Sequence, residues 1–168
     1  MVKEAGLAEP EYVIGQPRLQ KLEGFYFFYV EQKHSKPGQV GPSMDSLVRK
    51  AHDAYAKVIG ESCVPALCVM WFGVPGEPEL YDNQLGFAVR QGTTPLGEAK
   101  VRYVEPTLCV SLLAWGDVGV YAKSYGPLMD FANEKGLKCK EGWREWSLYW
   151  EGDNSKNNII LVQHPVEE

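Results

Sequence analysis

The sequence predicts an α+β fold in which two similar halves share one antiparallel-rich sheet. Runs of aromatic and β-branched residues, typical of strands, alternate with two stretches whose apolar residues recur with a helical period. The order is strand, glycine-containing loop, helix, strand, strand, and then the same again, in halves at roughly 24–91 and 100–166. Because each half is too small to bury its sheet face alone, we expect a tandem repeat with two main helices on one face and a ligand cleft between the halves.

The first half is expected to hold one helix among strands. Between Ser43 and Gly60, apolar residues recur with a period of 3.6, and the glycine is a typical helix stop. The proline, glycine and acidic residues of 75–83 predict a turn. Strands are expected where aromatic and β-branched residues cluster, at 25–32, 66–73 and 85–90.

The second half repeats this pattern. Pro106 is expected to bend or divide a strand that spans 101–115. The helical pattern that follows ends at Gly136, and Pro127 within it predicts either a late start or a kink. Further strands are expected at 142–150 and 158–163.

The chain is expected to form a single domain over residues 21–168. A chain of 168 residues can bury roughly 70% of its unfolded surface without disulfides or metals. Residues 1–20 are expected to be an N-terminal tail with a short strand at 12–14, because two prolines limit any longer element.

Composition narrows the classes of partner. The net charge is −5 and the basic residues form no stripe, which argues against nucleic acid. No apolar run approaches 18 residues and no signal-peptide core is present, so we expect a cytoplasmic protein that binds no membrane. The four cysteines and three histidines show no metal or catalytic-triad spacing, so no metal or cofactor is expected. The edge strands of such a sheet are compatible with a homodimer.

The strand at 142–150 carries the most informative residue. Side chains alternate between the faces of a strand, so Glu145 shares its face with Trp143, Ser147 and Tyr149. A carboxylate on a face that otherwise looks buried is costly unless it is paired, hydrogen-bonded or protonated.

Two explanations of Glu145 remain open from the residues. The carboxylate can anchor a cationic ligand, with aromatic faces adding roughly 0.5–2 kcal/mol each. Alternatively, it forms a structural ion pair with an arginine of a neighbouring strand, such as Arg90 or Arg102. Several other aromatic residues are candidates for pocket walls, and ordinary core packing is the alternative for each: Trp71, Phe27, Tyr29, Trp115 and Tyr125.

Five features of the second half occur in a fixed order. They are Gly119-Val120-Tyr121 before the helix, Gly136 after it, the strand opening Arg144-Glu145, the polar turn at 151–158, and Pro165-Val166 after the last strand. With these features, residues 20–166 resemble the GyrI-like family, which comprises effector-binding domains of multidrug-responsive transcription regulators and gyrase-inhibitory proteins.

The resemblance implies a stand-alone domain that senses or sequesters hydrophobic, cationic aromatic compounds. In the family, the strand glutamate lies at the floor of an aromatic pocket, and that role falls to Glu145. The family often has an aromatic residue two positions later, where this chain has Ser147, so the pocket lining is expected to differ.

The resemblance also leaves two other functions open. One is hydrolysis of reactive cyclopropane-bearing or similar electrophilic compounds, with Glu145 and Tyr149 as the catalytic pair. The other is a gyrase-inhibitor-like module that binds a protein through its surface.

Overall fold

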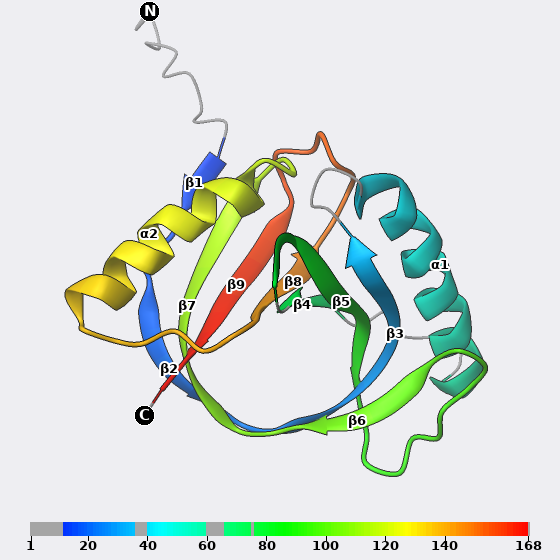
Figure 1. Ribbon diagram of the computed structural model, residues 1–168. Helices are drawn as coiled ribbons and strands as arrows, with labels where there is room; N and C mark the ends of the chain where they lie inside the picture. Colours follow the sequence, from blue (N-terminus) through cyan, green and yellow to red (C-terminus); the bar gives the residue numbers. More distant parts are fainter. Residues whose placement is uncertain (1–11, 36–39, 60–65, 75, 168) are drawn as a thin grey trace, which may run out of the picture.

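A computed structural model describes residues 12–35, 40–59, 66–74 and 76–167 (Figure 1). The described residues form one antiparallel sheet of nine strands and two α-helices. The helices are α1 (Val40–Ile59) and α2 (Val120–Glu134). The strands are β1 (Tyr12–Ile14), β2 (Arg18–Leu22), β3 (Phe25–Ser35), β4 (Leu67–Val74), β5 (Glu77–Val89), β6 (Lys100–Val104), β7 (Thr107–Gly116), β8 (Trp143–Tyr149) and β9 (Ile159–Val166).

The sheet contains the same unit twice. Its strand order is β1-β7-β9-β8-β4-β5-β3-β6, with β2 also paired to β7. In the unit β3-α1-β4-β5 the last strand pairs with both others, and the same holds in β7-α2-β8-β9. The two units meet where β4 pairs with β8. The predicted α+β fold with a tandem repeat is therefore confirmed.

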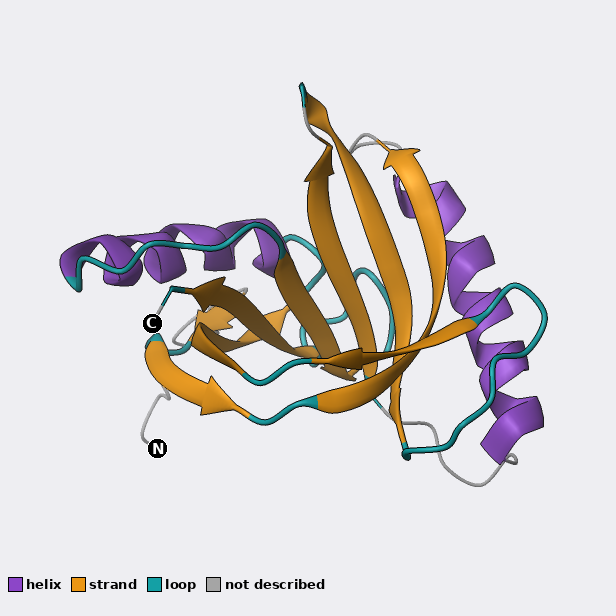
Figure 2. Cartoon of the chain, turned by 60° about the horizontal axis from the view of Figure 1, so that its bottom comes forward, coloured by secondary structure: helices purple, strands orange, loops and turns teal. Residues whose placement is uncertain are grey.

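The sheet curls strongly, although it does not close into a barrel (Figure 2). The curl comes from two bends that lie opposite each other, one between β2 and β3 and the other between β6 and β7. Across these bends, β2 pairs with β7 and β3 pairs with β6. Pro106 lies between β6 and β7 and has no N–H for the ladder. Gly24 lies opposite, between β2 and β3, where a Cβ would come within 2.8 Å of the Val104 carbonyl oxygen. The division of the strand at Pro106 is thus as predicted.

Both helices cover the same face of the sheet. Helix α2 packs on β7 and β9, around Val110, Leu128 and Val162. Helix α1 packs on β3 and β5, around Tyr55 and Phe87. Each fully buried aliphatic or aromatic side chain of this kind contributes about 1.5–3 kcal/mol. Side chains on the other face of the central strands form a third cluster: Phe27, Tyr29, Cys68, Met70 and Val104.

Two segments differ from the expectations in extent. The turn predicted at 75–83 is wrong for residues 77–83, because β5 begins at Glu77 and pairs with β4 along this length. The strand expected at 12–14 is β1, and β2 follows within the predicted tail; both pair with β7. Residues 1–11 lie outside the described part of the chain.

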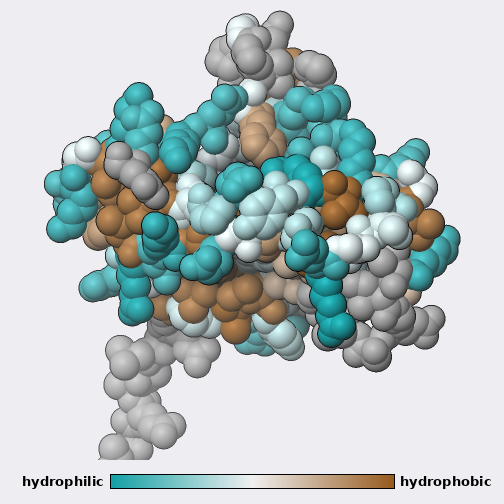
Figure 3. All heavy atoms as spheres, turned by 90° about the horizontal axis from the view of Figure 1, so that it is seen from below, coloured by the Kyte–Doolittle hydropathy of each residue, from teal (hydrophilic) through white to brown (hydrophobic). Residues whose placement is uncertain are grey.

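Hydrophobic and hydrophilic residues are mixed on the lower side of the molecule (Figure 3). Figure 3 shows hydrophobic side chains in separate patches with hydrophilic side chains between them. Among the helices of the described chain, neither combines the length and hydropathy that crossing a membrane requires.

Gly86 provides a test of the central β3-β5-β4 packing. An alanine Cβ at this position would come within 1.9 Å of the Phe28 carbonyl oxygen and 2.7 Å of the Tyr29 Cα, both of which are backbone atoms that cannot rotate away. We expect Gly86→Ala to lower the free energy of unfolding by about 3 kcal/mol or more in urea titrations.

The matched control is Gly73→Ala in the neighbouring strand β4. Its Cβ would contact only the Glu141 carboxylate, at an ordinary 3.6 Å. We expect a change within about 0.5 kcal/mol for this variant. Equal stability of the two variants would contradict the pairing described for β5.

Candidate functional site

Glu145 lies on the helix-covered face at the junction of the two repeats. Its strand, β8, runs between β4 and β9, where Glu145 is directly opposite Val69 and Val162. Val69 belongs to the core beneath α1, and Val162 belongs to the core beneath α2. The carboxylate is therefore placed between the two helix-packed cores, on their side of the sheet.

Three hydrogen-bond donors converge on the Glu145 carboxylate. Trp71 on β4 donates its Nε1–H to Oε2 over 2.9 Å. Trp143 on β8 donates its Nε1–H to Oε1 over 3.2 Å, and the hydroxyl of Tyr125 on α2 donates to the same oxygen. The donors thus come from both repeats and from both layers of the fold.

No cationic side chain of the described chain pairs with Glu145. Arg102 donates to Gln84 instead, and Arg90 is exposed beyond the end of β5. The ion pair considered for either arginine is therefore wrong. Among the described residues, the Glu145 carboxyl group is held only by neutral donors.

Aromatic rings surround the carboxylate. Trp71 and Trp143 are cross-strand partners, with ring centroids 6.0 Å apart and an interplanar angle of 13°. Tyr81 and Tyr125 meet Trp143 edge-on, at 5.3 Å and 5.7 Å. We call these four aromatic residues and Glu145 the Trp143 box. Each of the five is half-buried. Because the indole N–H edges hold the carboxylate, the ring faces stay next to the acid, and such a grouping is a favourable setting for an organic cation.

Ser147 continues the same face of β8. Its Oγ lies 2.9 Å from the hydroxyl of Tyr121 on α2, and either atom can donate. The ring of Tyr121 lies 6.0 Å from that of Trp150. Because serine is small, the hydroxyl of Tyr121 can approach β8 at position 147.

Burial controls the protonation of this site. It raises the pKa of the Glu145 carboxyl group, and the three donated hydrogen bonds oppose this effect without cancelling it. Burial also raises the pKa of Tyr125, and the adjacent Glu145 charge raises it further. The Tyr125 hydroxyl consequently stays protonated and remains a donor at neutral pH.

Comparison with known proteins finds solved structures that share the fold of this chain. No protein-family model matches the sequence, and no curated protein matches it. The C-terminal domain of EcmrR superposes with a TM-score of 0.71 at 16% sequence identity, over 92% of this chain and 98% of that domain. SAV2435 bound to tetraphenylphosphonium gives 0.62 at 11% identity, over 90% of this chain and 94% of that one.

This chain has the GyrI-like fold. A hydrolase from Listeria innocua shares it as well, with a TM-score of 0.60 at 16% identity over 90% of this chain and 92% of that one. In the EcmrR–DNA complex, the matched part covers 58% of the EcmrR chain. The GyrI-like architecture implied by the sequence resemblance is confirmed, and at these identities the likeness concerns the fold alone.

Within the GyrI-like fold, the structure gathers part of the predicted site. Trp71, Trp143 and Tyr125 contact Glu145, and Ser147 lies on the same face of β8. Their role in binding a ligand stays a prediction. Among the described residues, no three His, Cys, Asp or Glu side chains are grouped as a metal site would need.

The other candidates lie elsewhere. Phe27 and Tyr29 belong to the cluster on the opposite face of the sheet. Trp115 lies on β7 beside Val13 of β1, away from β8. Tyr149 is 49% exposed and its hydroxyl donates to Glu151, because the pairing with β9 shifts register between Ser147 and Tyr149. The tyrosine that contacts Glu145 is therefore Tyr125, not Tyr149 as the catalytic alternative supposed.

Two members of the surroundings were not expected from the sequence. Tyr81 falls within the segment predicted to be a turn. The signal that could have identified it is its spacing of two from Asn83 and Leu85, which places all three on one face of a strand. His164 lies on β9 with its ring 6.5 Å from that of Trp143. Burial lowers the pKa of His164, so it contributes no charge to the box at neutral pH.

The raised pKa of Glu145 predicts a specific pH dependence of stability. The folded protein holds the Glu145 proton to a higher pH than the unfolded chain, where a glutamate titrates near about 4.3. This contribution to stability is complete below the unfolded pKa and is lost as the pH rises through the folded pKa. We therefore expect the free energy of unfolding of the wild type to fall relative to that of Glu145→Gln over this interval.

Chemical denaturation from pH 4 to pH 8 measures the difference. Glu105→Gln, at an exposed position between β6 and β7, is the control and should follow the wild-type profile. Parallel profiles for the wild type and Glu145→Gln would show that the carboxyl group is not desolvated.

Proposed function

We propose that this chain binds small hydrophobic cations that carry aromatic groups, with Glu145 as their counter-charge, and so senses or sequesters them. The observation that carries the proposal is the Glu145 carboxylate, held by Trp71, Trp143 and Tyr125 with no cationic partner in the described chain. A desolvated carboxylate gains strongly when a ligand supplies the missing charge. The fold shared with SAV2435, solved with tetraphenylphosphonium, supports this class of ligand.

The rings of the Trp143 box suit cations whose charge is spread over an apolar body. Cation–π attraction to Trp71, Tyr81 and Trp143 adds about 0.5–2 kcal/mol for each ring that the ligand reaches. A compact, strongly hydrated ion gains the same attraction but loses far more hydration on entry. The box therefore favours lipophilic organic cations over Na⁺ or a simple ammonium.

Proton release is expected to accompany binding. Because burial raises the pKa of Glu145, part of the population carries a neutral carboxyl group at mildly acidic pH. Only the ionised form attracts a cation, so affinity should increase with pH until Glu145 is fully ionised.

Calorimetric titration with tetraphenylphosphonium and the neutral triphenylphosphine oxide tests the proposal. We expect Glu145→Gln to weaken binding of the cation about tenfold or more, because the amide carries no charge, while binding of the neutral compound changes little. Glu105→Gln, which alters the net charge equally at an exposed position, should leave both affinities as they are. Unchanged cation affinity in Glu145→Gln would remove Glu145 from the proposal.

One observation favours a second function on the same residues, namely hydrolysis of electrophiles that carry a strained ring. Tyr125 donates to Glu145, and burial raises the pKa of the Glu145 carboxyl group, which makes its ionised form a stronger base. Ionised Glu145 would take a proton from water as the oxygen bonds to a cyclopropane carbon. The ring C–C bond breaks, and its electron pair reaches a conjugated carbonyl oxygen, which accepts the Tyr125 proton.

Turnover of a spirocyclopropyl dienone, followed by its loss of absorbance, tests this second function. We expect Glu145→Gln to reduce kcat at least 100-fold and Tyr125→Phe to reduce it less, because water can replace an acid more readily than a base. The control Tyr149→Phe alters an exposed hydroxyl paired with Glu151 and should retain wild-type kcat. Background rates for all proteins would rule the reaction out.

The remaining expectations rest on composition or resemblance. The gyrase-inhibitor-like role, the absence of a nucleic-acid partner, the cytoplasmic location, the homodimer and the division into a tail and one domain stay predictions.

A further inference from the structure

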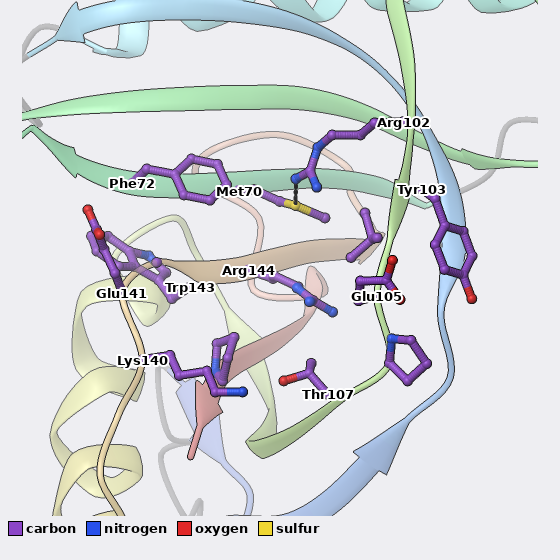
Figure 4. Close-up of a pocket in the computed structure, with 14 residues that line it drawn as sticks. Met70, Phe72, Arg102, Tyr103, Glu105, Thr107, Lys140, Glu141, Trp143 and Arg144 are labelled. Carbon is purple, nitrogen blue, oxygen red and sulfur yellow. Dashed lines mark hydrogen bonds between the residues drawn. The ribbon is translucent and has the colours of Figure 1, made fainter. Parts of the chain in front are cut away.

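A second concave site lies on the sheet face opposite to Glu145. It is a cavity of about 320 Å³ at the bend between β6 and β7, and its lining includes Arg102, Lys140 and Arg144 (Figure 4). A volume near 300 Å³ is at the lower end of those that hold small organic ligands. The three cationic side chains come from β6, from the segment after α2 and from β8, so the fold brings them together from distant parts of the sequence.

Arg144 is the central group of this cavity. It precedes Glu145 on β8, so its side chain projects from the other face of the strand, and Figure 4 shows it directed into the cavity. Only 9% of the residue is exposed. Its guanidinium forms no hydrogen bond or ion pair with a described residue, and its Cζ lies over the Phe25 ring, 5.9 Å from the ring centroid. A buried guanidinium of this kind is costly unless a ligand supplies its partner.

Arg102 adds a second charge without a carboxylate partner among the described residues. Its guanidinium donates to Gln84 Oε1 over 2.8 Å and 3.0 Å, and to the Met70 sulfur over 3.2 Å. The pKa of Arg102 is lowered chiefly by burial, and the charge of Arg144 contributes to the same effect. The two guanidinium groups therefore repel each other in the absence of an anion.

The rest of the lining is mainly apolar or weakly polar. Met70, Phe72 and Pro165 provide apolar walls, and Thr107 provides a hydroxyl. The cavity also has two acidic neighbours, Glu105 and Glu141, which are exposed and form no ion pair with Arg102 or Arg144. Figure 4 shows Arg102, Arg144 and Lys140 around the cavity, with Met70 next to Arg102.

We propose that this cavity binds an amphipathic organic anion, with a carboxylate or sulfonate held by Arg144 and Arg102 and an apolar body against Met70 and Phe72. Guanidinium groups bind such oxyanions through two parallel hydrogen bonds, and the low-dielectric surroundings strengthen each bond. The anchoring charges of the two sites are separate, because residues 144 and 145 project to opposite faces of β8, although Trp143 of the box also borders this cavity.

Fluorescence titration with 1-anilinonaphthalene-8-sulfonate and the neutral N-phenyl-1-naphthylamine tests the proposal. We expect one sulfonate site per chain, bound at least tenfold more tightly than the neutral compound. Arg144→Met should weaken sulfonate binding about tenfold or more, because it removes a charge-assisted pair while keeping an unbranched side chain at this position. Arg90→Met removes an exposed arginine that lies beyond the end of β5, so it should bind the sulfonate as the wild type does.

Thermal denaturation distinguishes the anion site from a purely structural role of Arg144. If the role were structural, Arg144→Met would lower the melting temperature. Without the probe, we expect Arg144→Met to melt at a higher temperature than the wild type, because a buried unpaired charge is gone. The sulfonate should then raise the melting temperature of the wild type but not that of the variant.

Two results would overturn the anion site. One is a sulfonate affinity of Arg144→Met equal to that of the wild type, and the other is equal affinity of the wild type for the charged and neutral probes. If Arg144→Met does not fold, Arg102→Met takes its place: loss of sulfonate affinity supports the site, and unchanged affinity refutes it. Because the test uses an anionic probe and no variant of Glu145, failure of cation binding leaves it intact.

Discussion

The solvation of one carboxylate is the constraint on which the candidate site depends. Glu145 is withdrawn from water and receives hydrogen bonds from Trp71, Trp143 and Tyr125 in return. Trp71 reaches it only through the pairing of β4 with β8, and Tyr125 only through the packing of α2 on the sheet. Neither repeat can assemble this environment alone, so the site forms only when the repeats join. The GyrI-like fold thus serves here to bring neutral donors to an acid from two directions.

Sequence periodicity predicted the parts of this site that depend on local geometry. Alternation along β8 placed Glu145, Trp143 and Ser147 on one face, as the structure has them. The same rule failed for Tyr149, because a register shift after Ser147 interrupts the alternation. Alternation could not predict which face of the sheet Phe27 occupies, because β3 is apolar on both faces. Tyr81 was missed because composition resembling a turn concealed the start of β5, where pairing with β4 outweighs local propensity.

The two faces of the central sheet have opposite chemical character. On one face a carboxylate is surrounded by aromatic rings and lies between the helices, and on the other two guanidinium groups border a cavity. Adjacent residues supply the central charge of each face, Glu145 and Arg144. Each of these groups is partly desolvated and has no counter-ion among the residues that the structure describes, so the protein gives up stability on both faces. Such an arrangement is typical of sites whose partners come from solution.

The alternation of charge along β8 also bears on the fidelity of folding. If β8 slipped by one residue against β4 and β9, every side chain would change face. The carboxylate would then project to the side of Cys68 and Met70, and the guanidinium would project to the side of Trp71, whose indole N–H offers it only a donor. Glu145 would lose its three donors and Arg144 would find no acceptor in their place, so a misaligned sheet is disfavoured by about 3–5 kcal/mol, the cost of leaving one buried charge without its partners. The pair that defines the two faces therefore also selects the correct strand register during assembly.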